Sequence, residues 1–201
     1  MSEMVELGGC VALDLEIVHA IEKGGPYSFG RPWELCVSVA CTYNVKDGFK
    51  DWFGGPSRVG NPDMGALVSY LDNFGMVITF NGARFDLRVL DGHVAIGNDE
   101  PPPLVATMLA GRHVDMMLDY QDAVGKRCSL GHMAQSTLGE SKVEDGANAP
   151  QMWADNLRLE VITYCRDDTL KTWKIFEYGL EHGYVKAYGK TINVIWRGRD
   201  P

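Results

Sequence analysis

The 201-residue sequence predicts an α/β fold, and three patterns carry the prediction. Residues 11–18 form an apolar run that Asp14 and Glu16 interrupt with the period of two of a strand. Residues 76–80 are continuously apolar between Gly75 and Asn81, which is typical of a strand buried on both faces. Residues 157–181 repeat apolar side chains at helical spacing over the longest such stretch of the chain.

The first half of the chain predicts an antiparallel start followed by a helix. Turn residues at 24–26 (Gly-Gly-Pro) and 46–48 (Lys-Asp-Gly) separate three expected strands. Asp63 follows Pro62 and suits a helix N-cap, so a helix is expected from residue 63 to about residue 74. The three strands are expected at residues 11–18, 34–44 and 49–53.

The second half alternates strands and helices. After the strand at 76–80, a helix is expected near Asp86, and residues 97–103 mark an exposed loop because three prolines continue neither periodicity. Residues 191–196 are open to two interpretations, a short strand or a docking tail. The remaining core elements are a strand at 113–118, a helix at 129–138, a polar loop at 139–150 and the helix at 157–181.

Two acids interrupt the first strand. Asp14 and Glu16 are two residues apart, so both side chains lie on one face. Buried together they would repel each other and lose hydration, a cost that a divalent cation removes. The alternative is an edge strand whose acids lie on a solvated face. The apolar neighbours that face the other way are Leu13, Leu15 and Ile17.

Further acids follow the buried strand and occupy the long helix. Asp86 comes shortly after Asn81, and the alternative reading is an ordinary first-turn acid favoured by the helix dipole. Tyr164 and Asp168 are four residues apart, so a phenol and a carboxylate converge on one helix face, unless both lie on an exposed flank. Asp167 would turn away from that face and is expected at the surface.

The ordered set Asp-x-Glu, Asn-x-x-x-Phe-Asp and Tyr-x-x-x-Asp resembles the three motifs of the DEDD superfamily of 3′–5′ exonucleases. Tyr164 resembles the tyrosine-bearing subgroup, which includes polymerase proofreading domains and ribonuclease D, and position 163 is threonine where the other subgroup has histidine. A stretch from Ser129 through Gly139 to Lys142 resembles the segment common between the second and third motifs.

The resemblance covers about residues 11–176 and implies a ribonuclease H-like fold, with a mixed five-stranded sheet flanked by helices. It implies one exonuclease domain over residues 1–201, with a core at about 8–182 and a C-terminal extension at about 183–201. The implied reaction is hydrolysis of phosphodiester bonds at single-stranded DNA or RNA 3′ ends by a two-metal mechanism. DNA and RNA remain equal alternatives.

The resemblance also implies a role for each motif residue. Asp14 would bridge two divalent cations, Glu16 and Asp168 would hold the one that activates water, and Asp86 would support the second through water. Carboxylate oxygens favour Mg²⁺ or Mn²⁺ over zinc. Tyr164 would orient the attacking water, because a phenol with a pKa of about 10 remains protonated at neutral pH. The end-nucleotide pocket would involve Asn81, Phe85 and Leu15.

Composition narrows the class of protein. The chain is 45% hydrophobic and 23% charged, as ordinary globular proteins are. No apolar run approaches the ~20 residues of a membrane span, and the N-terminus lacks the basic start of a signal peptide, so a cytoplasmic protein without membrane contact is expected.

A net charge of −8 argues against a phosphate-rich partner, although the clustered acids account for part of it. Basic residues that could line a narrow channel, or simply lie at the surface, are Arg84, Arg88, Lys126, Arg127 and Lys142.

The sequence contains three patterns that could indicate other kinds of site. The five cysteines lack CxxC spacing, which favours buried reduced thiols. Cys128 and His132 supply two ligands where a structural zinc site needs about four. Residues 189–191 (Gly-Lys-Thr) resemble the end of a phosphate-binding loop, but Gly183 is one residue out of register.

Two other functional classes remain open. One is a catalytically silent nucleic-acid-binding or assembly module of the same fold, which would bind manganese weakly or not at all. The other is an unrelated α/β binding protein whose acids align by chance, which would show no metal-linked change in melting temperature. The sequence indicates no protein partner and no oligomeric state.

Overall fold

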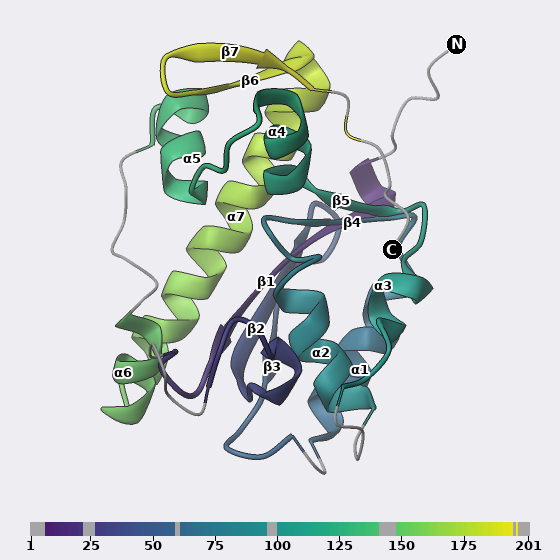
Figure 1. The fold of residues 1–201 in the computed structure, drawn as a ribbon, viewed down its shortest axis with the longest axis vertical. Helices are drawn as coiled ribbons and strands as arrows, with labels where there is room; N and C mark the ends of the chain where they lie inside the picture. Colours follow the sequence, from purple (N-terminus) through teal and green to yellow (C-terminus); the bar gives the residue numbers. More distant parts are fainter. Residues whose placement is uncertain are drawn as a thin grey trace.

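A mixed five-stranded sheet forms the centre of the molecule, in the order β3-β2-β1-β4-β5 (Figure 1). The computed structural model describes residues 7–21, 27–58, 61–95, 100–140, 148–194 and 196. The strand β1 lies in the middle, antiparallel to β2 and parallel to β4. The predicted α/β class and mixed sheet are confirmed. The strands are β1 (Cys10–Ile17), β2 (Val37–Asn44), β3 (Gly48–Phe53), β4 (Met76–Thr79) and β5 (His113–Asp115).

Helices cover both faces of this sheet (Figure 1). Two short 3₁₀ helices, η1 (Leu7–Gly9) and η2 (Pro32–Glu34), precede β1 and β2. One face packs against α1 (Pro62–Leu71), α2 (Asp86–Val94) and α3 (Leu104–Met108). The other packs against α4 (Met116–Val124), α5 (Leu130–Leu138), α6 (Ala149–Ala154) and the long α7 (Arg158–His182).

The alternation along β1 assigns its acids to one face. The odd-numbered residues of the strand, from Val11 to Ile17, all belong to the apolar cluster beneath α1 and α2. Cys10 and Ala12 belong to the opposite cluster, which contains α7. Because successive side chains of a strand point to opposite faces, Asp14 and Glu16 lie on the α7 side. The period of two predicted from the sequence is therefore confirmed.

Several boundaries differ from the predictions. The expected strand at 113–118 ends at Asp115, because the Asp115 carboxylate accepts hydrogen bonds from the backbone N–H groups of Met117 and Leu118 and begins α4. The strand expected from residue 34 begins at Val37, because η2 precedes it. The expected turn at 24–26 lies outside the described residues, as does Lys142.

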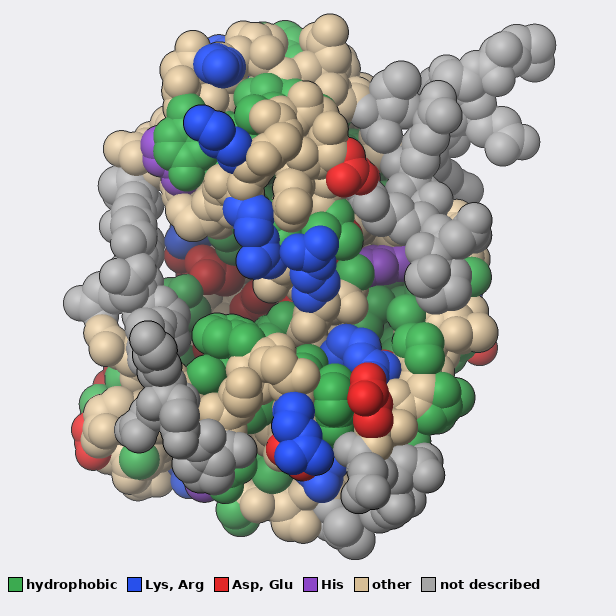
Figure 2. Space-filling model, viewed as in Figure 1, with side chains coloured by type: hydrophobic (Ala, Val, Ile, Leu, Met, Phe, Trp, Pro, Cys, Tyr) green, Lys and Arg blue, Asp and Glu red, His purple; other side chains and the backbone are tan. Residues whose placement is uncertain are grey.

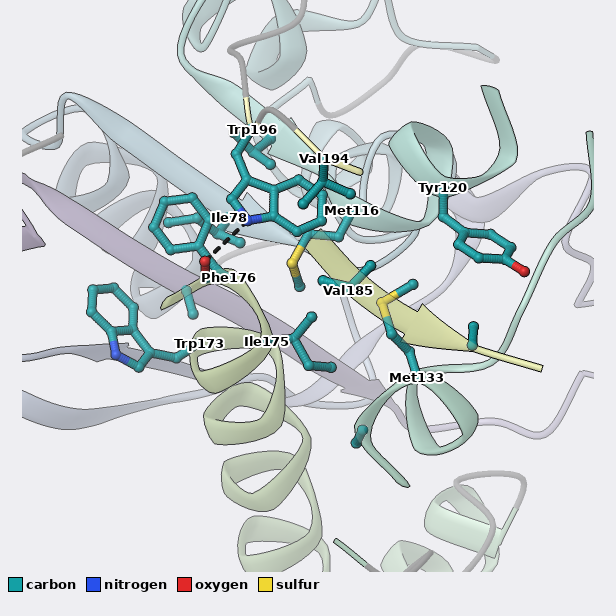
Figure 3. Close-up of a cluster of buried hydrophobic side chains, with 14 of the residues drawn as sticks. Ile78, Met116, Tyr120, Met133, Trp173, Ile175, Phe176, Val185, Val194 and Trp196 are labelled. Atoms are coloured by element: carbon teal, nitrogen blue, oxygen red, sulfur yellow. Dashed lines mark hydrogen bonds between the residues drawn. The ribbon is translucent and has the colours of Figure 1, made fainter. Parts of the chain in front are cut away.

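The C-terminal region combines the two alternatives left open by the sequence. β6 (Tyr184–Ala187) and β7 (Lys190–Asn193) form a separate hairpin. Beyond it, Trp196 packs on α7, where its Nε1 donates to the Phe176 carbonyl oxygen at 3.0 Å (Figure 3). A Cβ at Gly179 would lie 2.3 Å from Trp196 Nε1, so this position of α7 needs glycine.

All five cysteines are buried and none forms a disulfide, as predicted. No helix among the described residues is long and apolar enough to cross a membrane.

Candidate active site

A cavity opens where β1 and β4 separate. Their pairing ends at Ala12 and Ile78, after which β1 continues to Ile17 while β4 stops at Thr79. Open α/β sheets bind ligands at such points, beyond the carboxyl ends of parallel strands. The cavity measures about 420 Å³.

All eight residues singled out in the sequence line this one cavity. They come from β1, from the turn that follows β4, from the start of α2 and from α7. Figure 2 shows the acidic side chains in a recess near the middle of this face, with lysine and arginine side chains beside it. The eight residues are Asp14, Leu15, Glu16, Asn81, Phe85, Asp86, Tyr164 and Asp168. The lining also contains Ile17, Ala20, Ile21, Phe29, Phe80 and Pro150.

Burial and neighbouring negative charges disfavour ionisation of the two acids of β1. Burial raises the pKa of the Asp14 carboxyl well above its ordinary value, and the charges of Glu16, Asp86 and Asp168 raise it further. Burial likewise raises the pKa of Glu16, with Asp168 and then Asp86 adding to the effect. The charges of Asp86 and Asp168 thus oppose ionisation of Asp14 and Glu16, and a cation placed among these acids would stabilise the two anions.

Asp86 is the first residue of α2 and is almost fully buried. Burial raises its pKa to about 7, opposed by hydrogen bonds from its own backbone N–H and from that of Leu15, while the charge of Asp115 adds to the rise. The Leu15 N–H lies on the part of β1 that no longer pairs with β4. The Asp86 carboxylate therefore accepts a hydrogen bond from this N–H at a position where β4 offers no acceptor. The Leu15 side chain packs in the apolar cluster, so its link to the acids is through its backbone.

Tyr164 and Asp168 meet as their spacing predicts. The Tyr164 hydroxyl donates to Asp168 Oδ2 at 2.7 Å, and burial, followed by the Asp168 charge, raises the pKa of the phenol. Asp168 Oδ1 accepts from Lys171 Nζ at 3.1 Å. Asp167 also pairs with Lys171, so it is not the plain surface residue that helical geometry predicted.

The turn after β4 is held by a carboxylate that sequence reasoning missed. Asp115, fully buried at the end of β5, accepts hydrogen bonds from the N–H groups of Asn81 (2.9 Å) and Ala83 (3.0 Å). Asn81 takes a positive φ of 73°, and Gly82 follows where a Cβ would lie 2.4 Å from Thr79 Oγ1. Asp115 is also the N-cap of α4, so it connects this turn to that helix. In the sequence, the feature that could have indicated this role is an Asp, a favoured N-cap residue, inside an apolar run.

Asp115→Asn should destabilise the protein. The amide group would place a donor against the Ala83 N–H, which loses its acceptor, so the free energy of unfolding should fall by about 2–3 kcal/mol. Urea unfolding measures this, with the exposed Glu160→Gln as the matched control on α7. A change below about 0.5 kcal/mol, the range of ordinary surface substitutions, would contradict the bridging role.

Aromatic and basic side chains border the acids. Phe29 is 69% exposed, and its ring centroid lies 5.7 Å from that of Phe85. Arg127 donates from Nη2 to Asn81 Oδ1 at 2.6 Å. Arg88, in contrast, pairs with the buried Asp91 at 2.5 Å and serves the packing of α2 and α3. Arg84 and Lys126 are exposed.

The donor chemistry of the cavity suits a hard divalent cation, because the four acids offer only oxygen ligands in mutual repulsion. Their present side-chain positions do not form a finished ligand set. Among the described residues, no group of three or more His, Cys, Asp and Glu side chains is arranged to hold a metal ion.

Comparison with known proteins adds two findings. A family model described as the RNase H superfamily matches residues 58–179, a range that contains Asp86, Tyr164 and Asp168 and begins after Asp14 and Glu16. No curated protein sequence matches.

Among solved structures, the family B DNA polymerase from the hyperthermophilic archaeon Pyrobaculum calidifontis is similar, with a TM-score of 0.60 and 18% identity. The similarity covers 85% of this chain and 24% of the polymerase chain, so this chain spans about a quarter of the polymerase's length. At that identity the likeness concerns the fold alone.

Proposed function

The chain belongs to the RNase H superfamily, and from this premise we propose that it is a metal-dependent 3′–5′ exonuclease of the tyrosine-bearing DEDD subgroup. One observation carries the proposal. Acids from β1, α2 and α7, distant in sequence, line a single cavity together with Tyr164. The motif order supports the subgroup, and a polymerase that shares the fold over 24% of its length is consistent with a family that includes proofreading domains.

The acids of the cavity would hold two divalent cations, Mg²⁺ or Mn²⁺. Bound ions of this kind lower the pKa of water and neutralise charge that develops on the leaving oxygen. The protein's contribution is a set of buried, mutually repelling carboxylates, whose cost is offset when positive charge enters the cavity. The proposed ligands are Asp14, Glu16, Asp86 and Asp168.

Tyr164 would orient the attacking water. Its hydroxyl proton is donated to Asp168, so the phenol oxygen is left as an acceptor for a water molecule in the cavity that both residues line. Because burial and the Asp168 charge raise the pKa of the phenol, it remains protonated at neutral pH. A protonated phenol positions water by hydrogen bonding and does not serve as general base.

Tyr164→Phe should therefore slow turnover without loosening the metal site. We expect kcat to fall about 10- to 100-fold, the effect of one positioned hydrogen bond, with Mn²⁺ affinity unchanged within about twofold. Tyr178→Phe is a matched control, since Tyr178 lies on the same helix and bonds the Tyr184 hydroxyl. A loss of Mn²⁺ affinity in Tyr164→Phe would instead make the tyrosine part of the ligand scaffold.

The surroundings of the cavity favour a single-stranded end as substrate. The exposed Phe29 ring beside Phe85 offers a stacking surface for a base. Arg127, held at Asn81 on the rim, offers a cation to a phosphate. A volume of about 420 Å³ suits one small ligand group and not a duplex.

The proposal is tested by digesting 5′-labelled single-stranded DNA and RNA of one sequence with Mn²⁺, Mg²⁺ or chelator. Stepwise shortening from the 3′ end that chelator prevents would support it, and the faster substrate names the preferred sugar. Internal cuts, or shortening that survives chelator, would overturn it.

A second candidate is the catalytically silent binding module. It is favoured by the absence of a finished metal-ligand group among the described residues and by the engagement of both Asp168 oxygens. Manganese titration separates the two, because a silent module should bind the ion weakly and remain inert toward both substrates.

A further inference from the structure

A buried lysine pairs with one of the acids that line the cavity. Only 4% of the Lys171 side chain is exposed, although it lies on α7, one turn after the acids at 167 and 168. Burying an ammonium group is costly unless it is paired. Lys171 is paired twice, with Asp168 Oδ1 at 3.1 Å and with Asp167 Oδ2.

Both carboxylate oxygens of Asp168 have a donor. One accepts from Tyr164 and the other from Lys171. Each oxygen can accept a second partner, so a cation that binds Asp168 comes close to the ammonium group and is repelled by its charge. Asp167 offers the ammonium a second acceptor, and its side chain is 34% exposed against 17% for Asp168.

We propose that Lys171 is a built-in counterion of the cavity, which neutralises Asp168 until a divalent cation takes that carboxylate and then stays with Asp167. This inference rests on the proposed function, since it concerns the cation site of the same cavity. Lys171 is thus a positioning residue that sets how tightly the cavity binds its ions. In this arrangement Asp167 keeps the ammonium group of Lys171 paired after Asp168 has bound a cation.

The size of the effect follows from Coulomb's law. A unit charge about 5 Å from a divalent ion changes the affinity by at least about tenfold, even when it is screened as strongly as in water. Removing the ammonium should strengthen cation binding by that factor. Removing Asp167 should do the opposite, because Lys171 is then left with Asp168 alone.

The experiment measures Mn²⁺ binding from the paramagnetic resonance of the free ion, together with the melting temperature in chelator and in saturating Mn²⁺. The variants are Lys171→Met, Lys171→Arg, Asp167→Asn and the double variant Lys171→Met/Asp167→Asn. Lys174→Met is the matched control, since it removes a lysine from the same helix that pairs with Glu140 at 2.5 Å.

We expect Lys171→Met to bind Mn²⁺ about tenfold more tightly, to melt lower in chelator and to gain more from Mn²⁺ than the unmodified protein. Lys171→Arg and Lys174→Met should keep the original affinity. Asp167→Asn should bind about threefold more weakly, and it should have little effect in the Lys171→Met background. This dependence on background separates a shared ammonium from a general loss of negative charge.

Unchanged or weaker binding in Lys171→Met would overturn the inference and leave the proposed function standing. Equal effects of Asp167→Asn in both backgrounds would overturn it too. If Lys171→Met does not fold, Asp167→Asn decides alone, and unchanged affinity there refutes the inference. Absence of Mn²⁺ binding in the unmodified protein would refute both the inference and the proposed function.

Discussion

Asp14→Asn should abolish cleavage and at the same time raise the melting temperature. The carboxylate is one of the proposed cation ligands, so its loss should reduce the rate by at least about 1,000-fold, or about 4 kcal/mol of barrier. Its raised pKa makes it a destabilising group above that pKa, because the folded chain resists ionisation that the unfolded chain permits. An uncharged isostere removes this penalty.

The two effects are measured on one preparation, by 3′-end digestion with Mn²⁺ and by thermal unfolding in chelator at pH 8. Each kcal/mol gained should raise the melting temperature by about 2–4 °C for a chain of this size. Asp155→Asn is the matched control, since that acid ends α6 and bonds Gln151 at 2.9 Å. A lower melting temperature would show that Asp14 is held by unrecognised partners, and retained cleavage would remove it from the catalytic set.

The second large effect concerns pH. Burial raises the pKa of Asp86 from 3.8 to about 7, so between these values the folded protein binds more protons than the unfolded chain. Stability should therefore fall as pH rises through this window, and the part of the loss that Asp86 contributes should be about 4 kcal/mol, complete above pH 7. Asp86→Asn should lack this part of the loss, while Asp14 and Glu16 remain in both proteins.

Urea unfolding in chelator at pH 5 and pH 8 measures the difference between the two proteins. His93 acts in the opposite direction, because burial lowers its pKa to about 4 and stability then rises with pH from about 4 to 6.5. Both proteins keep His93, so its contribution cancels in the comparison. A difference that stays constant with pH would show that Asp86 ionises normally.

The sequence predicted what local periodicity controls. A period of two placed Asp14 and Glu16 on one face, and a spacing of four brought the Tyr164 hydroxyl 2.7 Å from Asp168. The helix expected at 129–138 is α5, and in the structure the Ser129 side chain caps it by accepting from the His132 N–H. Each of these depends on neighbours within a turn or a strand.

The residues that were missed depend on tertiary contacts. Phe29 lies in the connection between β1 and β2, where no periodicity indicates the path of the chain. Asp115 sits in an apolar run that suits a strand and a helix equally, and only its capping hydrogen bonds decide. The pairing of Lys171 could have been predicted, since it follows two adjacent acids at helical spacings of three and four. Its burial could not, because burial depends on how α7 packs on the sheet and not on the local sequence.

The contact between β1 and α7 affects the order in which the cavity forms during folding. Cys165 Sγ donates to the Asp14 carbonyl oxygen at 3.5 Å, which joins segments from opposite ends of the chain. Contacts between residues so far apart in sequence form late in folding, because the chain must first lose the entropy of closing a long loop. A nascent chain that has not yet released α7 carries the acids of β1 without Asp168 and Tyr164. On the proposed function, such a chain lacks two of the residues that cleavage needs, so activity would appear only after α7 has docked on β1.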